Sequence, residues 1–162
     1  MRYKNKSASQ VPKKICRAAV RKNMKAQIEK QLQEISKLAV KLEVIVEEKL
    51  DNEFAGILQK WADATNYDIL QKGYSKRLKV YSRFYSYNGM EPVYYLKTCE
   101  AKLYYVSKND YYENNFKYER EVDFKTLQIY DKISIIRSLK DFFEKYIEDL
   151  NYYIERIKKL EE

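Results

Sequence analysis

Apolar residues recur at alternating spacings of four and three in two long segments of the chain. The first segment runs from Met24 to about Ala62, and the second runs from Asp131 toward the C-terminus. These spacings place apolar side chains on one face of an α-helix, and in the first segment they match the seam of a coiled coil. The pattern predicts two long amphipathic helices. Their apolar stripes are Ile28, Leu32, Ile35, Ala39, Leu42 and Val46, and then Ile133, Ile136, Leu139, Phe143, Ile147, Leu150, Ile154, Ile157 and Leu160.

Both stripes are expected to be buried, either against each other or against a sheet. The first helix should end near the sequence ATNYD and before Gly73, because asparagine and glycine favour helix ends. Asp131 should cap the second helix, since an aspartate side chain at that position accepts hydrogen bonds from the first turn.

Polar and apolar residues alternate between the two helices, which predicts antiparallel strands. Residues 78–85 form the first expected strand, and YNG at Tyr87–Gly89 indicates a hairpin turn. Val93–Ser107 can form a second strand with a bend near its middle, and the turn KND follows at Lys108–Asp110. Phe116–Phe124 alternates again and predicts a last strand with an acidic outer face.

The predicted fold is therefore α+β. It consists of a basic N-terminal arm, a long helix, an antiparallel meander of three or four strands and a long C-terminal helix. Residues 1–25 form the arm, which is expected to be partly disordered or a short helix, and residues 26–162 form a single domain.

The positive charge of the chain is concentrated in the arm. The net charge is +8, and residues 1–25 hold nine basic residues and no acidic one. Such a basic arm is typical of proteins that bind a polyanion, although a solubilising tail has the same composition. Pro12 suits the first turn of a short helix. The candidate binding residues of the arm are Arg2, Lys4, Lys6, Lys13, Lys14, Arg17, Arg21 and Lys22.

Tyrosine is unusually frequent, with 17 residues in the chain. On the first expected strand, aromatic and basic side chains share one parity, and therefore one face. Such a face suits stacking with the bases of a single-stranded nucleic acid, contact with another protein, or a sheet covered by its own helix. The three interpretations stay open. The residues on this face are Lys79, Tyr81, Arg83, Tyr85 and Tyr87.

The composition lacks the parts of many catalytic sites. The chain has no histidine, two cysteines and three scattered glycines. This excludes a histidine-based nucleophile pair, a structural zinc site made of cysteine and histidine, and a glycine-rich phosphate loop. We therefore predict a protein that is not an enzyme and has no cofactor or metal. The alternative is a metal-dependent nuclease, because Glu100 and Lys102 have the E-x-K spacing of that chemistry.

The remaining bulk features favour a cytoplasmic protein with no membrane partner. No apolar run approaches the roughly 20 residues that cross a bilayer, and no apolar signal segment follows the basic N-terminus. Cys16 and Cys99 are isolated from each other in the sequence, as expected of free thiols in a reducing compartment.

In layout, the chain resembles the small proteins with which phages and mobile elements inhibit host defence, anti-CRISPR proteins in particular. The resemblance rests on the arm MRYKNKSASQVPKK, on the helix–sheet–helix body and on the missing catalytic parts, without a shared motif. It implies a protein that binds a CRISPR effector nuclease in the cytoplasm of a bacterial host cell.

The first functional hypothesis is a non-enzymatic binding protein that engages nucleic acid or a nucleic-acid-processing complex. The alternative is an interaction or scaffold protein that oligomerises through its helices, for instance as a homodimer, and binds no nucleic acid.

Overall fold

The computed structural model of the protein describes residues 11–73, 77–83 and 91–160. It confirms the α+β fold class, with long helices and a four-stranded antiparallel sheet. The chain divides into two compact units, Met1–Val44 and Ile45–Glu162. The predicted hairpin turn at Tyr87–Gly89 lies outside the described residues.

Helix α1 (Val11–Val46) makes up the described part of the first unit. It begins earlier than the heptad pattern predicts, so that the second half of the basic arm is helical. Alanine, lysine, arginine and glutamine dominate this region, and all are strong helix formers. Pro12 is tolerated in the first turn because the N–H groups there have no partner within the helix.

The apolar stripe of α1 is exposed, so the prediction that it forms core is wrong. Ile28, Leu32 and Ile35 keep 50%, 57% and 60% of their surface in contact with solvent. A helical pattern of apolar residues identifies a face that can pack, but it does not say whether the same chain supplies the other side.

The second unit begins with a π-helical turn, Glu47–Asp51, and continues with α2 (Asn52–Ala64). Phe54, Leu58 and Trp61 form the buried face of α2. The helix ends at Thr65, as the sequence predicts, and the Thr65 hydroxyl donates to the carbonyl of Trp61 at 2.8 Å. A short helix, α3 (Asp68–Gly73), follows.

The four strands form a meander in which every neighbour in sequence is also a neighbour in the sheet. The sheet order is β1-β2-β3-β4, and the strands are Arg77–Ser82, Pro92–Lys97, Leu103–Ser107 and Arg120–Val122. The single bent strand predicted for Val93–Ser107 is in fact two strands. The chain reverses between them at Cys99, whose φ of 64° lies in the left-handed region.

Two other predicted elements differ from the structure. The expected turn at Lys108–Asp110 is the start of a short helix, α4 (Lys108–Tyr112). Ser107 caps it by accepting a hydrogen bond from the Asp110 N–H. The last strand is confined to β4, because only residues 120–122 pair with β3.

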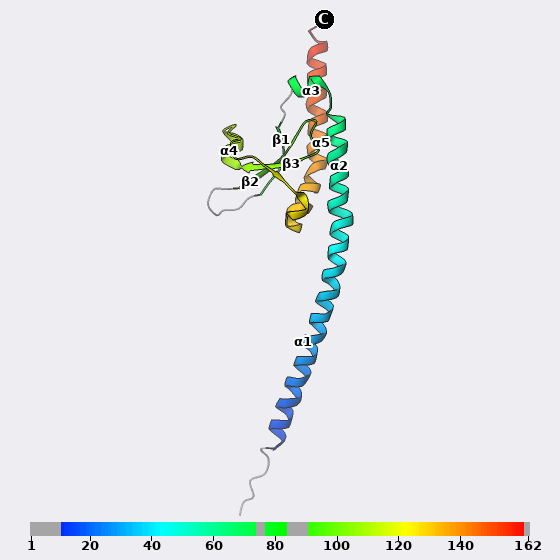
Figure 1. The fold of residues 1–162 in the computed structure, drawn as a ribbon, viewed down its shortest axis with the longest axis vertical. Coiled ribbons are helices and arrows are strands. Elements are labelled where there is room, and N and C mark those ends of the chain that lie inside the picture. The colour runs from blue at the N-terminus through cyan, green and yellow to red at the C-terminus, as the bar shows by residue number, and fades with distance from the viewer. Residues whose placement is uncertain (1–10, 74–76, 84–90, 161–162) are drawn as a thin grey trace, which may run out of the picture. The chain divides into compact units, whose positions relative to one another are not determined.

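Helix α5 (Ile129–Lys158) lies beside α2, with the sheet on one side of the pair (Figure 1). The apolar core between these layers contains Trp61, whose indole stacks against Phe143 and meets Tyr146 edge-on. The indole N–H also donates to the carbonyl of Lys97 on β2 at 2.9 Å. Trp61 therefore joins both helices to the sheet.

The opposite face of the sheet holds a second, smaller core. Tyr95, Tyr104 and Val106 are buried there, and Tyr111 and Phe116 pack over them. Successive residues of a strand point to opposite faces. The tyrosine pairs of β2 and β3 therefore supply both cores at once.

The stripe of α5 is buried only in its first half. Leu139 of the predicted stripe is 3% exposed and Ile136 is partly buried, whereas Ile154 and Ile157 are 49% and 60% exposed. The most deeply buried isoleucine of α5 is Ile135, which the stripe does not include. The helix begins at Ile129 with Gln128 as N-cap, so the prediction that Asp131 is the cap is wrong. Asp131 lies inside the first turn and is buried.

Within the described residues, no helix is long and apolar enough to cross a bilayer.

A buried ion pair connects the π-helical turn to α5. The Lys132 Nζ lies 2.7 Å from the Asp51 Oδ1, and the two side chains are only 4% and 9% exposed. At this burial, each charge depends largely on the other for solvation, because both side chains are mostly shielded from bulk water.

Replacing Lys132 with methionine should destabilise the protein by about 3–5 kcal/mol, because it leaves the Asp51 carboxylate buried and unpaired. Urea unfolding measures this loss. The double variant Asp51→Leu/Lys132→Met should recover most of it, since no charge remains. Lys140→Met is the matched control, because Lys140 is 79% exposed in its pair with Glu144. An equal loss in Lys132→Met and Lys140→Met would contradict the prediction.

Candidate functional site

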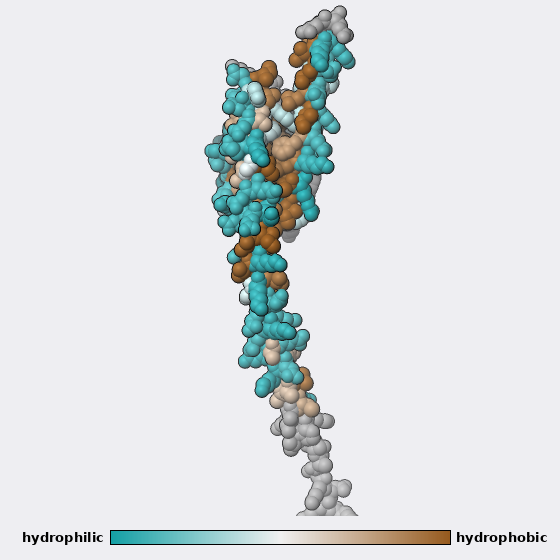
Figure 2. Space-filling view, turned by 90° about the vertical axis from the view of Figure 1, so that its right-hand side faces the viewer, coloured by the Kyte–Doolittle hydropathy of each residue, from teal (hydrophilic) through white to brown (hydrophobic). Residues whose placement is uncertain are grey.

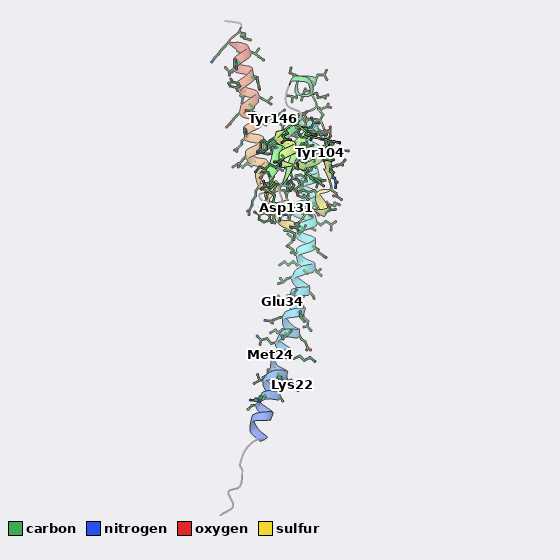
Figure 3. The ribbon with its side chains drawn as sticks, turned by 90° about the vertical axis from the view of Figure 1, so that its left-hand side faces the viewer. Lys22, Met24, Glu34, Tyr104, Asp131 and Tyr146 are labelled. Atoms are coloured by element: carbon green, nitrogen blue, oxygen red, sulfur yellow. The ribbon has the colours of Figure 1, made fainter. Side chains whose placement is uncertain are left out.

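The described cations of the arm lie on the surface of α1. Arg17, Arg21 and Lys22 are exposed, and Lys22 projects from the helix near Met24 (Figure 3). Lys13 and Lys14 also lie within α1. The predicted binding residues Arg2, Lys4 and Lys6 fall outside the described part of the chain.

The basic and apolar rows of α1 form one continuous face. Arg17, Arg21 and Lys25 are four residues apart, so they line up along the helix. The apolar row from Ile28 to Leu42 continues in the same direction at spacings of four and three. The face is therefore cationic toward the N-terminus and apolar toward the C-terminus. In Figure 2, brown apolar side chains lie among teal hydrophilic ones along α1.

Few acidic side chains lie near the cations of this face. The ion pair described among them joins Lys25 to Glu29 at 3.9 Å, with both side chains well exposed. An exposed pair at this distance contributes little and leaves the lysine available to a stronger anion. The electrostatic potential of this half of α1 is therefore positive.

The predicted basic-aromatic face of the first strand does not exist as one face. Lys79 pairs with Tyr95, but Tyr81 pairs with Tyr94, and a β-bulge at Val80 accounts for the shift. A bulge adds one residue to one strand and reverses the parity of all that follows. Because Tyr94 and Tyr95 point to opposite faces, Lys79 and Tyr81 do too.

The side chains of these residues have partners within the protein. Lys79 is exposed and donates to the Tyr112 hydroxyl at 3.2 Å. The half-buried Tyr81 stacks on Tyr94, with 6.0 Å between ring centroids, and burial raises the pKa of its hydroxyl.

Arg83 follows β1 and turns toward α5. Its Nη1 lies 3.0 Å from the Asp131 Oδ2, and a weaker contact reaches Gln128 at 3.5 Å. The Arg83 side chain is 20% exposed, so its charge is largely balanced within the fold. Tyr85 and Tyr87 lie outside the described residues.

A polar cluster on the outer face of the sheet, centred on Glu119, is not predicted by the sequence. Lys97 binds the Glu119 carboxylate at 2.8 Å, and the Tyr95 hydroxyl donates to it at 2.5 Å. The Lys97 ammonium also lies 4.0 Å from the centre of the Tyr104 ring. The sequence signal for this cluster is the period-two placement of Glu119, which by itself indicates only a solvated acidic edge.

The pKa of Glu119 reflects a balance within this cluster. Burial alone would raise the pKa of the carboxyl, but the hydrogen bonds from Lys97 and Tyr95 outweigh it and lower the pKa below its usual value. The carboxylate is therefore charged at neutral pH and fastens the loop before β4 to β2.

The two residues of the E-x-K spacing bind separate partners. Glu100 accepts a hydrogen bond from the Tyr104 hydroxyl, and Lys102 forms an exposed ion pair with Glu121 at 2.9 Å. Glu91, the acid upstream of them, binds Lys108 at 2.9 Å. Among the residues that the structure describes, no three histidine, cysteine, aspartate or glutamate side chains gather where they could hold a metal ion.

The described tyrosines of β2 and β3 are mostly core residues. Burial raises the pKa of Tyr94 to about 12, and it also raises the pKa values of Tyr95 and Tyr104. Tyr94, Tyr95 and Tyr104 keep at most 9% of their surface in contact with solvent. These rings are accordingly unavailable for stacking on a nucleic-acid base.

Ionisation of Tyr94 should make the protein less stable in alkaline solution. The folded state holds this proton up to about pH 12, whereas the unfolded chain releases it near 10. The stability that the protonated Tyr94 hydroxyl contributes is fully present below pH 10 and is lost as the pH rises through 12.

Urea unfolding across this pH range, together with the absorbance of tyrosinate, measures the effect. Tyr94→Phe should lose less stability with rising pH than the wild type does. Tyr152→Phe is the control, because Tyr152 is 56% exposed. Identical alkaline profiles for the wild type and Tyr94→Phe would show that Tyr94 is solvated.

Helix α1 thus offers two features that a partner could use, its cationic row and its apolar row. Both lie on a helix whose side chains are exposed from residue 16 to residue 45. Comparison with protein-family models, with curated proteins and with solved structures finds no match to this chain.

Proposed function

We propose that the protein is a non-enzymatic binding protein that engages nucleic acid, or a complex that processes nucleic acid, through the basic half of α1. The observation that carries this proposal is the exposed cationic row of α1. Six lysine and arginine residues fall between Val11 and Lys25 with no acidic residue among them. A helix with this charge attracts phosphates and binds them by releasing their counterions.

The sheet takes no part in the proposed contact. The bulge at Val80 separates Lys79 from Tyr81, and Asp131 balances the charge of Arg83. Affinity should then come from charge more than from base stacking, and it should depend strongly on salt and weakly on sequence.

The more specific proposal is a phage-type inhibitor of a CRISPR effector nuclease. It is supported by the resemblance in layout and by the position of the cations on an exposed helix. The surface of an effector that holds the phosphates of a guide or target strand is itself basic, so it repels a cationic helix while it is empty. Once nucleic acid is bound there, its phosphates supply the negative charge that attracts the helix. The target would therefore be the nucleic-acid-loaded effector.

Removing three cations from α1 should flatten the salt dependence of nucleic-acid binding. In the variant Arg17→Gln/Arg21→Gln/Lys22→Gln, the slope of log affinity against log salt for a labelled single strand should fall by about 2, since each lost phosphate contact removes roughly 0.7. Fluorescence anisotropy across a salt series measures the slope.

The control removes the same charge from exposed positions of α5 and its C-terminal end, as Lys140→Gln/Lys145→Gln/Lys159→Gln. This control should keep the wild-type slope. Equal slopes for the two triple variants would place the contact elsewhere, and no binding by the wild type at low salt would overturn the nucleic-acid proposal.

The inhibitor proposal has its own test in the cleavage of target DNA by loaded CRISPR effector nucleases. The wild-type protein should slow cleavage by at least one effector, and the α1 triple variant should slow it less than the α5 control does. Unchanged cleavage across effectors of each type would contradict the inhibitor function. Direct nucleic-acid binding would then still be decided by the salt series.

A further inference from the structure

We propose that the face of α1 between Lys22 and Glu43 is the antiparallel interface with α1 of a second copy of this chain. This pairing does not rest on the proposed nucleic-acid binding, because it uses the apolar row and only one of the three cations tested above.

The apolar row has the composition and exposure of an interface without its partner. Ile28, Leu32 and Ile35 are at least half exposed, and Leu42 is 47% exposed. Large aliphatic side chains in contact with water at successive a and d positions gain free energy when a second helix covers them. The exposed row continues for several turns, which distinguishes it from scattered surface leucines.

Charge disfavours the parallel arrangement of two such helices. In a parallel pair in register, each seam position faces its own copy. Arg21 and Lys25 occupy the seam immediately before Ile28, so each would face an identical cation. An antiparallel pair instead brings the basic start of each helix to the part of the other helix that contains Glu43.

Charge also selects one antiparallel register. When Leu32 packs against Ile35 of the second copy, Ile28 packs against Ala39 and Lys25 lies against Leu42. The flanking positions then place Lys22 beside Glu43 of the second copy, once at each end of the interface. A shift by one heptad would place Glu29 beside Glu43, with like charges opposed at both ends.

The side chains suit this register in size as well as in charge. Ala39 leaves room for the larger Ile28, so the layer is neither empty nor overfilled. Lys25 can pack its aliphatic stem on Leu42 of the second copy, while its ammonium group reaches toward Glu43 of that second copy. The interface is therefore apolar in its middle and paired by charge at its two ends.

Sedimentation equilibrium of the full chain should give twice the monomer mass of 19.6 kDa. Ile35→Lys should return the protein to a monomer, because it places a charge in the central layer of both helices. Val44→Lys is the matched control, since Val44 is 50% exposed and lies on the opposite side of α1. This control should stay dimeric.

A charge exchange tests the orientation. Lys22→Glu and Glu43→Lys should each weaken the dimer about tenfold, because like charges then face each other at two places. The double variant Lys22→Glu/Glu43→Lys should restore the affinity to within a few-fold of the wild type. In a parallel pair the two positions are on the order of 30 Å apart, so the double variant would recover nothing.

Three outcomes would overturn the proposal. A wild-type protein that is monomeric at all concentrations would remove the second copy as the occupant of this face. Dissociation by Val44→Lys as readily as by Ile35→Lys would remove the seam, and a double charge variant as weak as the single ones would remove the antiparallel register. Circular dichroism of each variant shows whether α1 is still helical.

Discussion

Trp61 holds the second unit together, because its side chain joins α2 and α5 to the sheet. The ring packs against Phe142, Phe143 and Tyr146 of α5, and the indole N–H reaches the Lys97 carbonyl at the end of β2. The four-stranded sheet has apolar residues on both faces, so each face needs a packing partner. The contact between α2, α5 and the sheet covers one of these faces.

The helices can be predicted from the sequence far better than the sheet. Spacings of three and four define a helical face over many turns, so errors in the extent of a helix lie at its ends, such as the N-cap assigned to Asp131. The spacings do not give the burial of that face, which was predicted wrongly for α1. Strand register depends on single residues. Nothing in the alternation of residues 78–83 reveals that Val80 is an extra residue in β1, since a bulge is decided by packing on both sides of the strand.

The candidate site is partly visible in the sequence for the same reason. The cations of α1 are close together in the chain, and their charge can be counted from the sequence alone. The partner of Arg83 cannot be found in this way, because Asp131 lies 48 residues further on and meets it only in the folded protein. The cluster at Glu119 likewise joins residues from three separate segments. Local charge is thus a guide to exposed surfaces, whereas its neutralisation is a tertiary property.

The basic beginning of α1 has a consequence for the helix itself. Unpaired N–H groups make the start of any α-helix a region of partial positive charge, and α1 places lysines there with no acidic residue in its first turn. The lysines repel the positive end of the helix dipole, so the first turns of α1 depend on the intrinsic helix propensity of their residues. Any anion that settles on them relieves this repulsion and lowers the tendency of these turns to fray. By thermodynamic linkage, the free energy that the anion adds to the helix equals the free energy that helix formation adds to anion binding. The length of α1 in solution and its occupancy by an anion are thus a single equilibrium.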